Sequence, residues 1–142
     1  MSQTPTRPQN LEAAKGSSAL ADFMGMKTTF VSPERVESEL RVTPNLLNRN
    51  GALHGGVIMA LADNTGGSAA FIALNDDETT TTTESKTNFL RAIQNGELVK
   101  AVTTPLHIGR SMQVWQTNIY KEDGSLAAQV TQSQMTLKKR VK

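Results

Sequence analysis

The 142-residue sequence contains no cysteine, and aromatic residues make up only 4% of it. Without cysteine, disulfide bonds, zinc sites with thiolate ligands and thiol-based catalysis are excluded. The net charge is also small, at +2, and no segment combines basic with aromatic residues, so we expect no nucleic-acid partner. The hydrophobic fraction of 37% is nevertheless typical of a globular domain rather than of a disordered chain.

Long apolar runs are scarce as well. The longest one, residues 57–74, is interrupted by Asp63-Asn64-Thr65-Gly66-Gly67-Ser68, whereas a membrane span needs about 20 mostly apolar residues. Residues 1–10 lack the apolar core of a secretory signal. We therefore expect no membrane association and a cytoplasmic location, with residues 1–16 as a flexible N-terminal arm and residues 17–142 as a single domain.

One long helix and several strands follow from the periodicity. The run over residues 56–73 predicts a buried helix, and Ser17-Ser18 predict the start of a short helix that ends at Gly25. Strands are predicted over residues 27–31, 36–42, 79–91, 97–108, 111–120 and 125–137. Asn95-Gly96 and Glu122-Asp123-Gly124 are typical of hairpin turns. This order indicates an α+β domain in which one helix packs against one face of an antiparallel sheet.

The start of the long helix contains residues well suited to chemistry. Gly55 and Gly56 would expose unpaired backbone N–H groups and the positive end of the helix dipole. Such groups stabilise a carbonyl oxygen that becomes negative during a reaction, and the missing side chains let a ligand approach the backbone closely. His54 precedes the two glycines, and its side chain either fixes this loop or acts as a base.

Asp63 lies in the middle of the apolar helix, where a carboxylate is costly unless it is paired or used. Burial raises the pKa of such a group, which suits a general base or a nucleophile. The structural alternative is equally open, because the polar residues 64–66 could satisfy Asp63 at a kink in the helix. A metal site made by His54, Asp63 and His107 has no supporting ligand spacing, so we expect no metal.

The spacing within this helix also predicts an oligomer. Eight or nine residues at about 1.5 Å each separate Gly55 and His54 from Asp63 by roughly 12 to 14 Å. One small reaction centre cannot contact both ends of that span in a single chain. If both take part, they come from two subunits related by a two-fold axis.

Several motifs, in the same order and spacing, carry a resemblance to a known family. They are Asn48-x-x-Gly51-x-x-His54-Gly55-Gly56, Ala60-Leu61-Ala62-Asp63-Asn64, Thr82-Thr83-Glu84, Asn88-Phe89-Leu90-Arg91, His107-Ile108-Gly109-Arg110-Ser111 and Asp123-Gly124. As a set, these motifs resemble those of the hot-dog thioesterases of the 4-hydroxybenzoyl-CoA and phenylacetate-pathway type. The resemblance covers residues 25–138.

The resemblance implies a hot-dog fold, in which a curved antiparallel sheet wraps the long helix, and a homodimer or homotetramer with active sites at subunit interfaces. It implies hydrolysis of an acyl- or aryl-CoA to the free acid and coenzyme A, with no cofactor. Asp63 would be the general base or nucleophile, while the Gly55 N–H from the other subunit would polarise the thioester carbonyl. Asn48 would orient the carbonyl or the water, Thr82 would position the attacking water, and His54 belongs to the same catalytic group.

The resemblance also implies a set of residues that bind the CoA part of the substrate. These are Gly56, Phe89, Arg91, Gly109, Arg110 and Ser111. One position departs from the family, because related enzymes often carry Ser or Thr one turn after the acid, where this chain has Gly67.

Three other functions compete with hydrolysis. The first is a non-catalytic protein that binds or senses acyl-CoA. The second is a hot-dog dehydratase, which usually needs a catalytic histidine paired with an acid in a different arrangement. The third is a structural oligomer in which Asp63 is replaceable. The acyl group itself is not specified by the sequence.

Overall fold

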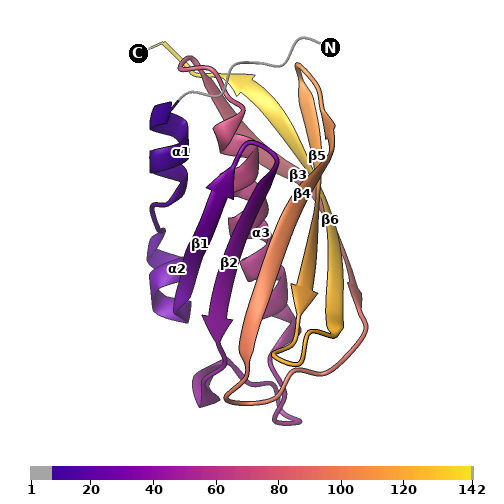
Figure 1. The fold of residues 1–142 in the computed structure, drawn as a ribbon. Coiled ribbons are helices and arrows are strands. Elements are labelled where there is room, and N and C mark those ends of the chain that lie inside the picture. Colours follow the sequence, from indigo (N-terminus) through magenta and orange to yellow (C-terminus); the bar gives the residue numbers. More distant parts are fainter. Residues whose placement is uncertain (1–7, 142) are drawn as a thin grey trace.

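The computed structural model describes residues 8–141, which form one curved, six-stranded antiparallel sheet around a long helix (Figure 1). The helices are α1 (Pro8–Ala14), α2 (Ala19–Met24) and α3 (Gly55–Ile72), with a 3-10 turn at Pro44–Leu46. The strands are β1 (Met26–Ser32), β2 (Arg35–Arg41), β3 (Glu78–Phe89), β4 (Leu98–Ile108), β5 (Met112–Tyr120) and β6 (Leu126–Lys138). The predicted α+β class is confirmed, and the predicted bounds of the long helix and of the strands agree with these within a few residues.

The helix α3 packs against the concave face of the sheet and forms the centre of the core. Its side chains at Leu61, Ala62 and Ala70 are fully buried, and Trp115 of β5 packs near the C-terminal half of the helix. On β2, buried residues alternate with exposed or half-buried ones from Arg35 to Arg41, as the period-two pattern predicts. No helix within residues 8–141 combines the length and the hydropathy that a membrane span requires.

The order of strands in the sheet is β1-β2-β4-β5-β6-β3, so β3 lies at one edge. This order corrects the hairpin predicted at Asn95-Gly96, because β3 pairs with β6 while β4 pairs with β2 and β5. Gly96 does adopt the left-handed backbone of a turn, at φ +87°, but its N–H donates to Val42 after β2. The sequence therefore predicted the turn at Asn95-Gly96 correctly, but the prediction that this turn joins two paired strands, β3 and β4, is wrong. The turn at 122–124 does join the paired strands β5 and β6, as predicted.

The N-terminal segment corrects a second prediction. Residues 8–14 form α1 rather than part of a flexible arm, whereas residues 1–7 lie outside the described part of the chain. Asn10 is buried, and its Nδ2 donates to the backbone oxygens of Ile72 and Leu74 at 3.3 and 2.9 Å. Since the last carbonyls of a helix have no partner within it, this amide satisfies the end of α3 and anchors α1 there.

Candidate active site

Asp63 projects from the middle of α3 toward strands β3 and β6. Its Oδ1 atom accepts a hydrogen bond from Thr82 Oγ1 at 3.0 Å and one from Gln132 Nε2 at 3.0 Å. Its Oδ2 atom accepts no hydrogen bond from any residue in 8–141, and the residue is exposed. The carboxylate is therefore held through one oxygen and open at the other.

The exposure of Asp63 corrects the burial expected from its apolar neighbours in the sequence. The helix turns this residue toward the edge of the core, whereas Thr65, two positions on, points inward and donates to Leu61 O. Among residues 8–141, Asp63 makes no ion pair. Its partners are hydroxyl and amide groups from two strands, so the polar residues at 64–66 do not satisfy it.

The hydroxyl of Thr82 is fully used. It donates its single proton to Asp63 and accepts from Gln132 Nε2 at 3.2 Å and Gln134 Nε2 at 2.7 Å. A hydroxyl has one donor and two acceptor positions. These contacts leave no position for a water, so they fit a role for Thr82 in orienting Asp63 rather than the water predicted from the resemblance.

The N-terminus of α3 is shaped by its two glycines and by His54. The Nδ1 atom of His54 accepts from the Gly56 N–H at 2.9 Å and caps the helix, and a Cβ on Gly56 would lie only 3.0 Å from that atom. This contact commits the Nδ1 atom to the start of the helix and supports the loop-fixing interpretation of His54. The Gly55 N–H has no acceptor in the described chain, and the Phe89 ring lies against Gly55.

Asn48 shapes the loop before this helix. Its Oδ1 atom accepts from the N–H groups of Asn50 and Ala52 at 2.9 and 3.1 Å, while its own N–H donates to Ala52 O at 2.7 Å. Gly51 follows with φ +82°, a backbone conformation that glycine adopts without strain. The side-chain oxygen of Asn48 is thus committed to the loop, and only its Nδ2 group is open to a substrate.

The residues predicted to bind CoA lie at two opposite ends of the sheet. Phe89 pairs with Ala128 on β6, whereas the carbonyl of Ser111 accepts from the N–H of Thr136. Eight residues of β6 separate these two points, which is roughly 26 Å at about 3.3 Å per residue. In one chain, therefore, the segment at 89–91 and the segment at 109–111 cannot bind the same part of a ligand.

The two predicted arginines differ in their contacts. Arg91 is exposed, and its Nη1 atom donates to the backbone oxygen of Leu126 at 2.7 Å, which ties it to the start of β6. Arg110 is exposed in the turn between β4 and β5, next to Gly109, whose N–H donates to Met112 O at 2.8 Å. Within the described residues, the Arg110 guanidinium makes no hydrogen bond, whereas Arg91 uses one of its five N–H donors on Leu126 O.

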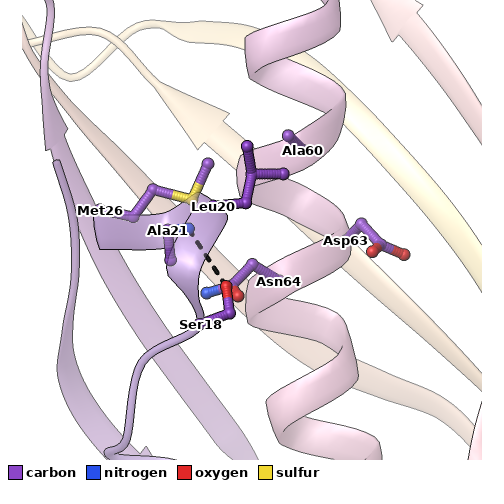
Figure 2. Close-up of a pocket in the computed structure, with 7 residues that line it drawn as sticks. All are labelled: Ser18, Leu20, Ala21, Met26, Ala60, Asp63 and Asn64. Atoms are coloured by element: carbon purple, nitrogen blue, oxygen red, sulfur yellow. Dashed lines mark hydrogen bonds between the residues drawn. The ribbon is translucent and has the colours of Figure 1, made fainter. Parts of the chain in front are cut away.

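Two hollows meet at Asp63 and Asn64. The first, of about 140 Å³, is also lined by Ser18, Leu20, Ala21, Met26 and Ala60 (Figure 2). The second is also lined by Ala13, Ala14, Gly67, Ser68 and Phe71. In Figure 2 the Asn64 side chain turns toward Ser18 and α2, while the Asp63 carboxylate points to the other side of the helix. A Cβ on Gly67 would meet nothing within 4 Å, so this departure from the family leaves open space one turn from the acid.

Sequence reasoning missed Gln132 and Gln134. Both are buried on β6, on the same face as Ala128 and Val130. The alternation along β6 contained the signal, because it places two long amides on the face that is otherwise apolar and turned to the helix. No group of three His, Asp or Glu side chains suited to a metal ion occurs in the described residues, and His54, Asp63 and His107 do not come together.

Comparison with known proteins decides the family. Residues 50–128, more than half of the chain, match the family model described as Thioesterase superfamily. The chain belongs to the thioesterase superfamily.

Individual relatives agree with this assignment. The proofreading thioesterase EntH of Cronobacter turicensis is 32% identical over 120 residues, which cover 83% of this chain and 87% of EntH. The 1,4-dihydroxy-2-naphthoyl-CoA hydrolase of Escherichia coli is 30% identical over 122 residues, which cover 84% of this chain and 89% of the hydrolase. The crystal structure of a thioesterase from Haemophilus influenzae superposes with a TM-score of 0.84 at 27% identity, covering 97% of this chain and 96% of that one. The sheet wrapped around α3 is thus a hot-dog fold, and the superfamily member described here is a thioester hydrolase.

Proposed function

We propose that this thioesterase hydrolyses acyl-CoA and that Asp63 carries the reaction. The observation that carries the proposal is the asymmetry of its carboxylate. Oδ1 is held by Thr82 and Gln132, whereas Oδ2 accepts no hydrogen bond from the described residues, and Asp63 as a residue is exposed. An oriented carboxylate with one open oxygen is suited to act on a bound ester.

Two routes lead from this arrangement to the same products. In the first, Oδ2 takes a proton from a water whose oxygen attacks the thioester carbon, the C–S bond breaks, and the thiolate of CoA receives the proton. In the second, Oδ2 itself attacks, CoA leaves as the thiolate, and water then hydrolyses the resulting anhydride. Both routes consume one water and release the free acid and CoA, and neither needs a metal or a cofactor.

The oxyanion is expected to be stabilised by the second subunit of a homodimer. Gly55 presents an unpaired N–H at the positive end of α3, eight residues and about 12 Å from Asp63 along the helix axis. The two groups can converge on one carbonyl only if they come from different chains. Strand β3 supports an assembly of this kind, because it is 12 residues long, lies at a sheet edge and leaves one row of backbone groups unpaired. Assembly of such dimers into a tetramer, and a cytoplasmic location, stay predictions.

A dimer would also resolve the separation of the CoA-binding candidates. Within one chain, the segments at 89–91 and 109–111 lie at opposite ends of the sheet, so we propose that a CoA molecule takes one segment from each subunit. Arg110 is the better candidate for a phosphate contact, because the Arg91 guanidinium already donates to Leu126 O.

The proposal is tested by following thiol release from purified protein across a panel of acyl-CoAs, beside the Asp63→Asn variant. The panel should include benzoyl- and short aliphatic thioesters, because the sequence does not specify the acyl group. Turnover that disappears in Asp63→Asn supports the proposal, and full activity in that variant overturns it. Absence of turnover with every substrate, while acyl-CoA still raises the melting temperature, would favour the acyl-CoA-binding alternative.

Mixing two inactive variants tests the shared site. Gly55→Pro removes the N–H at the first helical position, where proline is tolerated, and the extended backbone of His54 suits a residue before proline. Dissociating and reassociating it with Asp63→Asn should restore about a quarter of the wild-type activity. Random reassociation makes half of the dimers from one subunit of each variant. In each of these dimers, one of the two sites combines the unchanged Gly55 with the unchanged Asp63, and the other site carries both substitutions. No recovery from a reassociated mixture contradicts a site built from two subunits.

A further inference from the structure

The amide of Gln132 is buried between β6, β3 and α3, with none of its surface exposed. Its Nε2 atom donates to Asp63 Oδ1 and to Thr82 Oγ1, at 3.0 and 3.2 Å. Its Oε1 atom, although buried, has no hydrogen-bond partner among the described residues. A buried carbonyl oxygen without a partner costs stability, so this orientation of the amide requires a reason.

The charge of Asp63 supplies that reason. If the amide were rotated by half a turn, Oε1 would face Asp63 Oδ1, and two oxygens, one of them on an anion, would repel each other. The orientation with both N–H groups toward Asp63 and Thr82 is the one that a charged carboxylate favours. Oε1 is thus left unpaired because the amide is oriented to donate to Asp63, and this orientation does not stabilise the core.

Gly66 makes this arrangement possible. A Cβ atom built on Gly66 would lie 2.1 Å from Gln132 Oε1, which is closer than real Cβ atoms approach, and 3.0 Å from its Cδ atom. Any other residue at position 66 would push the amide away from α3, where Asp63 lies one turn earlier. A glycine in the middle of a helix is unfavourable for helix formation. Two features that lower stability, Gly66 and the unpaired Oε1 of Gln132, therefore lie in contact with each other.

We propose that Gln132 is a positioning residue that holds the Asp63 carboxylate in its reactive orientation, and that Gly66 is required to make room for the Gln132 amide. This inference rests on the proposed role of Asp63 in thioester hydrolysis. Two donors on Oδ1 restrict rotation of the carboxylate, so Oδ2 keeps a fixed direction toward the substrate. Gln132 itself takes no part in bond making or breaking.

The first test replaces Gln132 by methionine, which keeps the length of the side chain and removes both the donor and the unpaired oxygen. We expect kcat to fall about 10- to 100-fold, the range that corresponds to a hydrogen bond with a charged group, while KM changes little. The melting temperature should stay the same or rise, because the buried oxygen without a partner is gone.

Gln113 provides a matched control on the neighbouring strand. It is 2% exposed, accepts from Trp115 Nε1 at 2.8 Å and donates to Ala70 O at 3.3 Å, and it makes no hydrogen bond with Asp63. Gln113→Met should lower the melting temperature, because the indole N–H of Trp115 loses its partner, and leave kcat unchanged. The two glutamine variants should therefore show opposite effects on stability and activity, which a purely structural role for Gln132 would not produce.

Gly66→Ala is the second variant, and it retains every polar group of the site. It should lower kcat in the same way as Gln132→Met, because the new methyl group displaces the amide, and it decides the question if Gln132→Met fails to fold. In an Asp63→Asn background, Gln132→Met should cause no further loss.

The outcomes separate the two proposals. If Asp63→Asn is inactive but Gln132→Met keeps kcat within about twofold, the positioning role is overturned and the proposed function stands. If Asp63→Asn keeps full activity, the proposed function fails and the positioning role fails with it. If Gln132→Met lowers kcat and leaves the melting temperature unchanged or raised, the result supports both the positioning role of Gln132 and the proposed function of Asp63.

Discussion

The hydroxyl of Thr82 holds Oδ1 of Asp63 at 3.0 Å, although the two residues are 19 positions apart and belong to a strand and a helix. Strand β3 carries a bulge between Thr82 and Glu84, where its register with β6 shifts by one residue. Because of this bulge, Thr82 on one side and Ser85 on the other both face the helix. The contact therefore depends on an irregularity of the strand as well as on the residue type.

Replacing Thr82 tests this contact. Thr82→Val keeps the shape and removes the donor, so kcat should fall about tenfold or more with little change in KM. Thr82→Ser retains the hydroxyl and should keep most of the activity. Steady-state thiol release by both variants is the measurement, and equal activity of the valine and serine variants would contradict an orienting role.

His54 is expected to act as a helix cap rather than as a base. His54→Ala should lower stability by about 1 kcal/mol, because the Gly56 N–H loses its acceptor, whereas His54→Asn should keep it, since asparagine is a preferred cap. Thermal unfolding measures the stability, and thiol release measures the activity of the same samples. If His54→Asn folds normally but has lost its turnover, the histidine ring is needed for chemistry.

Asn10 is expected to control the docking of α1. Asn10→Leu removes the donor to Ile72 O and Leu74 O and should destabilise the fold by about 1 to 3 kcal/mol. Asn10→Asp is the matched variant, because a charged carboxylate cannot donate to these oxygens, and it should be less stable at neutral than at acidic pH relative to wild type. Unfolding in urea is the measurement, and unchanged midpoints for both variants would mean that α1 contributes nothing to stability.

Glu78 is expected to cause part of the loss of folding stability at acidic pH. The N–H of Asn75 donates to its Oε2 atom at 2.8 Å and, with a smaller effect of Lys138, holds the pKa of Glu78 below its usual value. A lowered pKa in the folded state adds stability at pH values above the unfolded pKa, and this stability is lost as the pH falls through the folded pKa. Glu78→Gln should flatten this part of the stability profile, by less than about 1 kcal/mol because the Lys138 partner is exposed. Chemical unfolding between pH 3 and 7 tests it, and parallel wild-type and variant profiles would refute it.

Local patterns were enough for the elements and for part of the site. The apolar run at 56–73 and the alternation on β2 reflect burial of one face, which a sequence records directly. Asp63 and Gly55 stood out because a carboxylate in an apolar helix and a glycine pair at a helix start are unusual in themselves. The separation of these two residues along α3 also followed from helix geometry alone.

Pairing between distant segments was not predictable in the same way. The turn at Asn95-Gly96 was recognised, yet strand order depends on which edges meet in three dimensions, and β3 pairs with β6 rather than with β4. The docking of α1 depends on Asn10 meeting carbonyls more than 60 positions away. Neither relationship leaves a periodic trace in the sequence.

The sequence by itself determined the helix, the strands and the family, and it named Asp63 as the candidate acid, because burial periodicity and short motifs are local properties of the chain. Only the tertiary structure decided what surrounds Asp63, since Thr82 and Gln132 come from strands that are distant in sequence and reach it by sheet pairing. It also decided that Gly66 is required for space, because a hydrogen atom in place of a methyl group matters only where another segment packs against it.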